Sequence, residues 1–189
     1  MAAADTPQRI LDIAEKLVQT RGFNGFSYAD IAQAMKVTKA SLHYHFPAKA
    51  DLGARLIERY ERNFLAALKG IDGQGRDARD KLRKYAAIYE EVLRDNRMCL
   101  CGMLAAEFGT LPKPMREDMR HFFDENERWL VGVLEQGRKE KTIKFSGPAS
   151  EVAQAIIGSL EGALMIARSY ADVARFAAAK ERILKDLAA

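Results

Sequence analysis

The chain has 189 residues, of which 48% are hydrophobic and 30% charged, and its formal net charge at pH 7 is +4. This composition is that of a soluble globular protein, and no apolar run approaches the roughly 20 residues that a transmembrane helix requires. The N-terminus lacks the basic start and apolar core of a secretory signal, which predicts a cytoplasmic protein. Cys99 and Cys101 are too few for a disulfide framework or a structural zinc site, so we expect neither a metal nor a cofactor.

Positive charge is concentrated in the N-terminal third of the chain. Residues 1–70 hold ten Lys and Arg against seven Asp and Glu, whereas the remaining 119 residues hold twenty against nineteen. A basic surplus of this kind is expected where a protein meets nucleic-acid phosphates. Because the surplus is small, it supports a DNA-binding motif without being sufficient on its own.

Local signals predict three short helices before residue 47. Pro7 at a first helical position, with Thr6 as its cap, begins the first helix, and Gly22 ends it after a basic last turn. Ser27 and the acidic residue three positions later form a capping-box variant that begins the second helix. Thr38 caps the third helix.

After Pro47 the apolar spacing predicts six further helices, separated by Gly- or Pro-containing breaks that include residues 70–75, 109–114 and 141–148. We therefore predict an all-α fold of about nine helices. A three-helix DNA-binding domain with a helix-turn-helix is expected over residues 1–47, and a larger ligand-binding and dimerisation domain over residues 48–189. The six helices are expected at about 49–69, 82–93, 98–108, 115–140, 149–170 and 172–187.

Residues 27–46 have the layout of a helix-turn-helix, in which a first helix braces a second that enters the DNA major groove. Lys39 and Ser41 lie at the start of the second helix, whose N-terminal residues typically reach base edges. Lysine can donate to guanine O6 and N7, and serine pairs with several bases. This pattern predicts a DNA-binding protein.

The same residues resemble a known family. The segments Gly22-Phe23-x-Gly-Phe-Ser27, Asp30-Ile31-Ala32, Val37-Thr38-Lys39-Ala40-Ser41-Leu42 and Tyr44-His45-Phe46-x-x-Lys49 are similar to the N-terminal signature of the TetR family. This resemblance implies a homodimeric bacterial transcriptional regulator, usually a repressor, that binds a palindromic DNA operator and is released by a small-molecule effector. The chain departs from the signature at His43, where an aromatic residue is usual, and at Ala48, where a better helix cap is common.

Nine residues are candidates for DNA contact, and several of them have a structural alternative. Ser27 is also explained as a helix cap, and Tyr44 is alternatively a core aromatic residue. His43 and His45 lie on roughly opposite sides of their helix, so we expect one to contact DNA and the other to pack. Lys49 in a first helical turn opposes the helix dipole unless a phosphate lies nearby; its alternative is a solvated lysine. The full set is Ser27, Tyr28, Thr38, Lys39, Ser41, His43, Tyr44, His45 and Lys49.

Aromatic residues and methionines on the expected inner faces of the later helices are candidates for an effector pocket, although such residues more often form plain core. Glu107 stands out because a carboxylate in an apolar helix needs a partner. A ligand donor or Arg168 would be such a partner, whereas a plain glutamate at the edge of a helix is the more common case. The candidate set is Phe64, Tyr85, Tyr89, Met103, Glu107, Phe122, Trp129 and Met165.

Cys99 carries an alternative hypothesis. The pattern Cys99-x-x-x-x-Leu104-Ala105-Ala106-Glu107, followed by Met115-Arg116, resembles a TetR branch that includes regulators of electrophile and aldehyde detoxification genes. This resemblance implies a repressor that senses electrophiles or redox state through Cys99. A buried cysteine is usually inert, which is the competing interpretation.

Two further features bear on assembly and on enzymatic activity. Gly158 and Gly162 lie one turn apart and would let another helix approach closely, which predicts a dimer interface formed by the last two helices of each copy. The alternative is close packing within one chain. The three histidines and two cysteines have no spacing that would build a catalytic or metal centre, so we expect no enzymatic activity.

Overall fold

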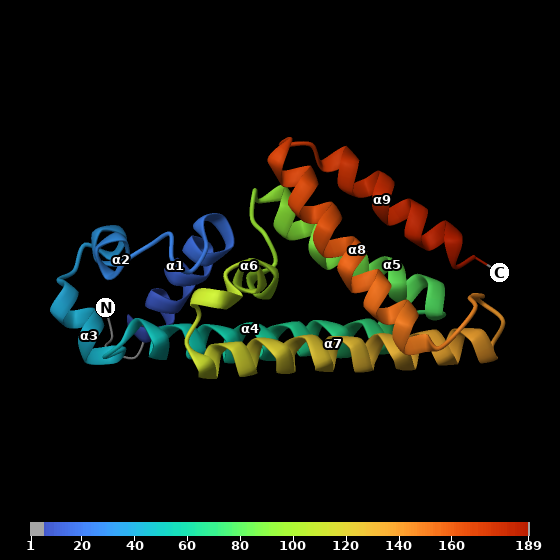
Figure 1. Cartoon of the computed structure of the whole chain (residues 1–189), viewed down its shortest axis with the longest axis horizontal. Coiled ribbons are helices and arrows are strands. Elements are labelled where there is room, and N and C mark those ends of the chain that lie inside the picture. The colour runs from blue at the N-terminus through green and yellow to red at the C-terminus, as the bar shows by residue number, and fades with distance from the viewer. Residues whose placement is uncertain (1–5, 189) are drawn as a thin grey trace. The chain divides into compact units, whose positions relative to one another are not determined.

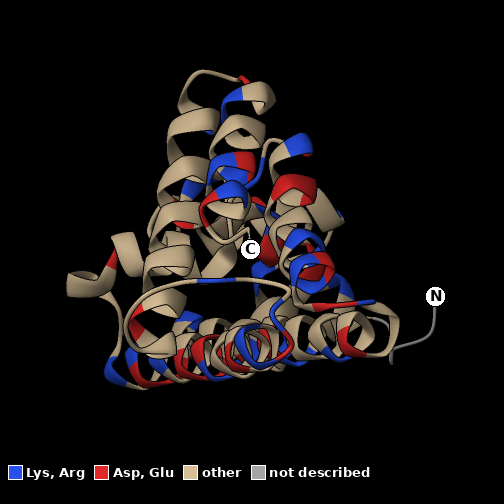
Figure 2. Cartoon of the chain, turned by 90° about the vertical axis from the view of Figure 1, so that its right-hand side faces the viewer, with Lys and Arg blue, Asp and Glu red and all other residues tan. Residues whose placement is uncertain are grey.

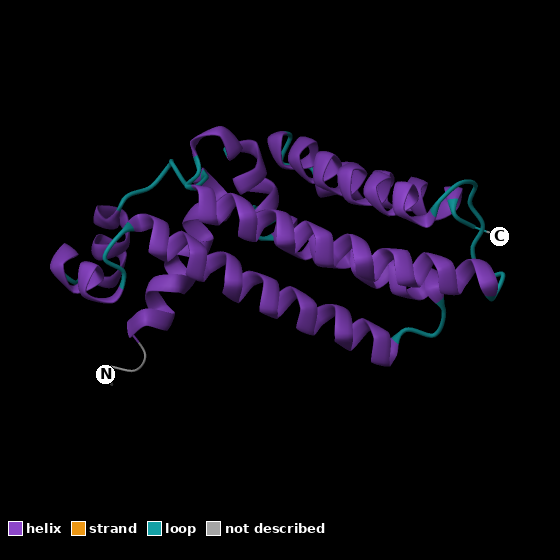
Figure 3. Ribbon diagram, turned by 60° about the horizontal axis from the view of Figure 1, so that its bottom comes forward, coloured by secondary structure: helices purple, strands orange, loops and turns teal. Residues whose placement is uncertain are grey.

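The computed structural model describes residues 6–188, and within them every regular element is helical (Figures 1 and 3). An isolated bridge between Ile143 and Ala188 is the one strand-like pairing among these residues. None of the helices described combines the length and hydropathy needed to cross a membrane. The elements are α1 (Thr6–Arg21), α2 (Tyr28–Met35), α3 (Lys39–His45), α4 (Lys49–Gln74), α5 (Ala78–Arg94), α6 (Leu100–Ala106), the 3-10 helix η2 (Phe108–Thr110), α7 (Lys113–Lys139), α8 (Ala149–Ser169) and α9 (Val173–Asp186).

The predicted all-α fold of nine α-helices is confirmed over residues 6–188. The predicted break over residues 70–75 is wrong for residues 70–74, which continue α4 instead of forming a loop. The buried side chain of Ile71 explains the continuation, since the apolar stripe of α4 extends past Gly70. The predicted helix 98–108 also proves shorter, because α6 ends at Ala106 and η2 follows.

The helices form two compact units. The first holds residues 6–62 and 99–122, and the second holds residues 63–98 and 123–188. Helices α4 and α7 each contribute residues to both units. Neither unit is therefore one continuous stretch of the sequence. The predicted functional boundary between residues 47 and 48 remains our proposal.

The first unit is built around α1. Its buried face includes Ile10, Ala14 and Val18, and α2 and α6 both pack against α1. Phe23 and Phe26 close this core, with ring centroids 6.1 Å apart and planes nearly perpendicular. Such edge-to-face pairs add to the stabilisation that burial alone provides.

In the second unit α5, α8 and α9 pack against one another (Figure 1). Most of their buried side chains are aliphatic, and the unit also holds a buried polar group. Asn126 of α7 is fully buried, accepts a hydrogen bond from the Tyr85 hydroxyl at 2.8 Å and donates to the Tyr89 hydroxyl at 3.3 Å. The two hydroxyls lie 3.0 Å apart, so each buried polar group has a partner.

Candidate DNA-binding site

The helix-turn-helix has the local geometry that the sequence predicts. Ser27 begins α2 with a complete capping box, since its hydroxyl accepts from Ala29 N while the Asp30 carboxylate accepts from Ser27 N at 2.8 Å. Thr38 begins α3, its hydroxyl accepting from Ser41 N at 3.4 Å. Between the two helices Lys36 adopts a left-handed conformation with φ of 58°, which turns the chain sharply.

Helix α3 presents most of its surface to solvent. Leu42 is its one buried residue, whereas Lys39 and Tyr44 are exposed and Ser41 is half-buried. The Tyr44 side chain is 84% exposed, so it is not a core aromatic residue. Lys39 and Tyr44 are therefore both accessible to a partner on the surface of α3.

The structure corrects the prediction that Tyr28 contacts DNA. Its side chain is buried, and its hydroxyl donates to the backbone oxygen of Phe46 at 2.8 Å. Burial, together with the negative charge of Asp51, raises the pKa of Tyr28 to about 12. Tyr28 therefore fastens the end of α3 to α2 instead of facing a phosphate.

The two histidines have different surroundings. The His43 ring lies against Tyr28, with centroids 4.7 Å apart, and its Nδ1 lies 3.1 Å from the Pro47 oxygen. The His45 ring is half-buried and meets the Tyr44 ring at a centroid distance of 5.1 Å. His43 remains exposed although it packs, so neither ring is removed from the candidate surface.

The structure also corrects the prediction that Lys49 contacts a DNA phosphate. Its ammonium donates to the backbone oxygens of Phe23 and Phe26, both at 2.5 Å, and lies over both phenyl rings, 4.6 and 4.2 Å from their centroids. Desolvation lowers the pKa of Lys49, against the opposing effect of Glu107 and Asp30. The amine therefore points into the protein, where it supplies donors to carbonyls in the turn before α2. We remove Lys49 from the proposed phosphate contacts.

The predicted effector residues fall into separate groups. Phe64, Tyr85, Tyr89 and Trp129 form one aromatic cluster in the second unit, where Tyr85 stacks on Trp129 at a centroid distance of 5.5 Å. Phe122 is buried in the first unit against Tyr60. Met103, also in the first unit, is half-buried on α6.

Two members of that set are in the wrong place for an effector pocket. Met165 is 52% exposed on α8, because Leu164 and Ala167 occupy the inward positions of that turn. The Glu107 carboxylate accepts hydrogen bonds from the backbone amides of Phe23 and Asn24, so its partner is neither a ligand nor Arg168. Arg168 donates instead to the Asn96 oxygen.

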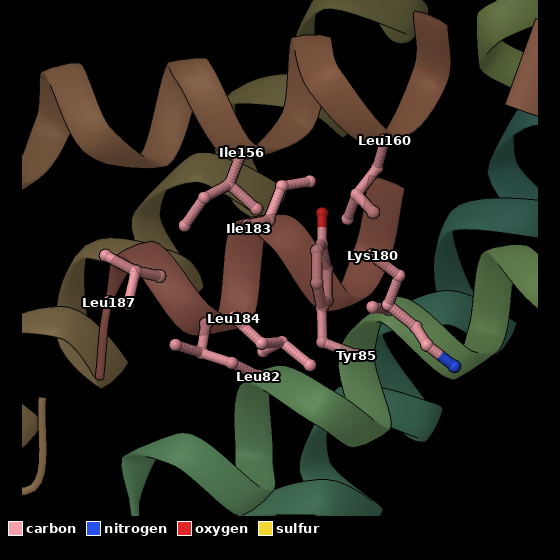
Figure 4. Close-up of a pocket in the computed structure, with 9 residues that line it drawn as sticks. Leu82, Tyr85, Ile156, Leu160, Lys180, Ile183, Leu184 and Leu187 are labelled. Carbon is pink, nitrogen blue, oxygen red and sulfur yellow. The ribbon is translucent and has the colours of Figure 1, made fainter. Parts of the chain in front are cut away.

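The second unit contains a small apolar cavity of about 10 Å³, close to the minimum that holds one water molecule. Figure 4 shows its aliphatic walls and the Tyr85 ring between them, with the Lys180 nitrogen directed away from the apolar side chains. That nitrogen donates to Glu90, and this hydrogen bond lowers the pKa of the Glu90 carboxyl. The lining residues are Leu82, Tyr85, Ala86, Ile156, Leu160, Lys180, Ile183, Leu184 and Leu187.

Cys99 does not have the environment of a reactive thiol. It is 1% exposed, and its Sγ accepts from the Tyr60 hydroxyl at 3.6 Å. A sensor cysteine is typically accessible and close to positive charge. Within residues 6–188 no group of three His, Cys, Asp or Glu side chains is arranged to hold a metal ion.

Two polar residues that organise the two units, Arg59 and Asn126, were not predicted from the sequence. Arg59 is 6% exposed and donates to Asp12 and Glu15 of α1, both at 2.6 Å. Asn126 is a second such residue, because its amide joins the buried hydroxyls of Tyr85 and Tyr89. The spacing of Asp12 and Glu15 on one helical face was the one available sign of a buried cation. Elsewhere opposite charges are mixed along the helices, as Figure 2 shows.

Comparison with known proteins agrees with this architecture. Residues 10–56 match the family described as bacterial regulatory proteins of the tetR family, and residues 78–183 match a tetracyclin repressor-like C-terminal domain. A TetR-family regulator from Agrobacterium tumefaciens is 31% identical over 98% of this chain and 99% of its own, with a TM-score of 0.95. A TetR regulator from Legionella pneumophila is 35% identical over 99% and 100% of the two chains, with a TM-score of 0.87.

A curated relative points in the same direction. The repressor DhaR from Mycobacterium sp. (strain GP1) is 23% identical over 87% of this chain and 83% of its own length. The matched family and these relatives are transcriptional regulators and not enzymes. With both family models matching and the helix-turn-helix in place, the chain belongs to the TetR family of DNA-binding transcriptional regulators.

Proposed function

We propose that this protein is a ligand-responsive repressor that binds a palindromic operator as a homodimer in the cytoplasm. The observation that carries the proposal is the surface of α3. A capped helix on a rigid brace exposes Lys39 and Tyr44, and only Leu42 anchors it. A structural helix of seven residues would bury more of its surface, whereas a recognition helix must leave base-reading side chains free.

The exposed residues divide by position along α3. Lys39 and Ser41 in the first turn are assigned to base edges, where lysine donates to guanine acceptors. Thr38, Tyr44 and Ser27 are assigned to the sugar-phosphate backbone, since hydroxyl groups commonly bind phosphate oxygens. His43 and His45 flank this surface, and their exposed edges complete it.

The outer side of α8 is proposed as the dimer interface. A Cβ added at Gly158 or Gly162 would have no neighbour within 4 Å, so neither glycine serves packing within one chain. Met165, Ile166 and Tyr170 extend the same apolar side and are 52%, 55% and 63% exposed. A stripe of small and apolar residues with this spacing suits a second copy of the helix, as expected in a twofold dimer.

The effector is proposed to act in the second unit, near the cluster of Phe64, Tyr85, Tyr89 and Trp129. The cavity beside Tyr85 is too small for an organic effector, so binding there requires these side chains to move apart. Because α4 continues from the first unit into the second, a change in its tilt would alter the spacing of the two recognition helices. An effector that prefers the altered state shifts the population away from DNA binding.

The test is DNA affinity, measured by fluorescence anisotropy on the fragment upstream of the chain's own gene. Lys39→Ala and Tyr44→Ala are each expected to weaken binding by roughly tenfold, on the order of 1–3 kcal/mol for a base or backbone contact. Lys139→Ala removes another exposed lysine, at the end of α7, and is the matched control. Unchanged affinity and an unchanged salt dependence in both α3 variants would remove α3 from the binding site.

A further inference from the structure

The turn between α1 and α2, residues 22–26, is held by side chains from distant parts of the first unit. The Glu107 carboxylate accepts from Phe23 N at 2.5 Å and from Asn24 N at 3.1 Å. The Asn24 side chain donates to the Thr110 hydroxyl at 2.7 Å. Three hydrogen bonds therefore join the turn to the segment formed by α6 and η2.

The chain around Gly22 is shaped to admit this carboxylate. Gly22 has φ of +85°, a conformation that L side chains rarely adopt. A Cβ at this position would lie 2.8 Å from Glu107 Oε1. Glycine thus serves both the backbone turn and the close approach of the carboxylate.

The backbone oxygens of the turn are bound by a cation, and its backbone amides are bound by an anion. Lys49 donates to the oxygens of Phe23 and Phe26, while Glu107 accepts from the amides of Phe23 and Asn24. Hydrogen bonds with one ionised partner are shorter and roughly twice as strong as neutral ones. The turn is therefore fixed from both sides by a matched anion and cation.

The position of Glu107 in its own helix is unfavourable without these contacts. It is the C-cap of α6, where the helix dipole disfavours a negative charge. Two backbone N–H donors from the α1–α2 turn offset that cost. A glutamate at a helix edge that served only solubility would have no reason to face this turn.

From these contacts we infer that Glu107 is a positioning residue for DNA recognition, an inference that rests on the proposed function. Ser27, the cap of α2, follows the clamped turn directly, and α2 packs against α3. Through Glu107, the α6–η2 segment sets where α2 begins and hence where α3 presents Lys39 and Tyr44. Glu107 itself does not touch DNA.

The experiment has two readouts on full-length protein, amide hydrogen exchange followed by NMR and affinity for the upstream DNA fragment. Glu107→Gln keeps the size of the side chain but loses one acceptor and the charge. We expect exchange at Phe23 and Asn24 to accelerate roughly tenfold or more and DNA affinity to fall roughly tenfold, as for loss of a hydrogen bond to a charged group. Glu107→Asp keeps the charge, but its shorter side chain does not reach the amides of Phe23 and Asn24. We expect it to change both readouts in the same direction as Glu107→Gln.

Glu135→Gln, an exposed glutamate of α7, is the matched control and should change neither readout. Unchanged exchange at Phe23 and Asn24 in both Glu107 variants would overturn the clamp. Faster exchange with wild-type DNA affinity would show a clamp without a positioning role and would overturn the inference while leaving the proposed function intact. Failure of the wild-type protein to bind DNA would overturn the proposed function, and the inference with it.

Discussion

The contacts inside the first unit differ in kind from those inside the second. In the first, half-buried or buried charged side chains join segments far apart in the sequence: Arg59 joins α4 to α1, and Lys49 and Glu107 hold the α1–α2 turn. In the second, the contacts of Asn126 with two tyrosines are neutral and lie among aromatic rings, and one ion pair, Lys180 with Glu90, joins α9 to α5.

This difference predicts how each unit responds to substitution. Charged contacts fix geometry but contribute modest net stability, because desolvation offsets most of their attraction. A buried neutral network is costly to break, because a buried polar group left without a partner keeps its full desolvation penalty. Substitutions that break the neutral network of the second unit should therefore cost stability, whereas those at the charged contacts of the first unit should cost less stability and more DNA binding.

The largest effect on stability is expected at Asn126. Asn126→Leu removes the acceptor of Tyr85 and the donor to Tyr89 at a fully buried position. We expect the free energy of unfolding to fall by about 2–3 kcal/mol, since buried hydroxyls lose partners. Urea denaturation followed by circular dichroism measures the change, and a loss below that of Arg59→Met would reverse the proposed ranking of the two units.

A smaller loss is expected for Arg59→Met, about 1–2 kcal/mol by the same measurement. Methionine keeps most of the buried volume, and the side chains of Asp12 and Glu15 are 58% and 20% exposed, so both carboxylates remain in contact with water when Arg59 is removed. Arg55→Met is a suitable control, because Arg55 is an exposed arginine of the same helix. Equal effects of the two substitutions would deny Arg59 its role between α1 and α4.

The smallest effect is expected at Lys180, and it should depend on pH. The hydrogen bond from Lys180 lowers the pKa of Glu90 below its ordinary value of 4.5. The stabilisation is therefore complete above pH 4.5 and is lost as pH falls through the folded-state pKa. Lys180→Met should cost about 1 kcal/mol at pH 7 and less at about pH 3.5. A penalty that stays constant with pH would show that packing, and not this ion pair, is lost.

The helix-turn-helix was predictable because its signals are local. Ser27, Thr38 and Gly22 act through backbone groups within four residues, so the ends of α1, α2 and α3 follow directly from the sequence. The exposure of Tyr44 follows from the same register. Local capping geometry is what a single sequence encodes most clearly.

The roles of Tyr28, Lys49 and Glu107 were not predictable, for a common physical reason. Their partners lie 18, 26 and 84 residues away in the sequence, and each partner is a backbone group that leaves no side-chain signature. Family motifs mark such positions without distinguishing a DNA contact from an internal hydrogen bond. The prediction that Met165 lines an effector pocket was wrong for a different reason, because helical periodicity alone does not say which apolar stripe of α8 faces inward.

The central claim is that α3 reads DNA as a twofold pair, and hydroxyl-radical footprinting of the wild-type protein on its upstream DNA tests it most directly. The account predicts protection in two dyad-related segments, their centres one helical turn or about 10 base pairs apart or a multiple of it. Lys39→Ala should weaken both segments together, while Lys139→Ala leaves them unchanged. A single protected segment, or symmetric protection that Lys39→Ala and Tyr44→Ala leave intact, would contradict the account.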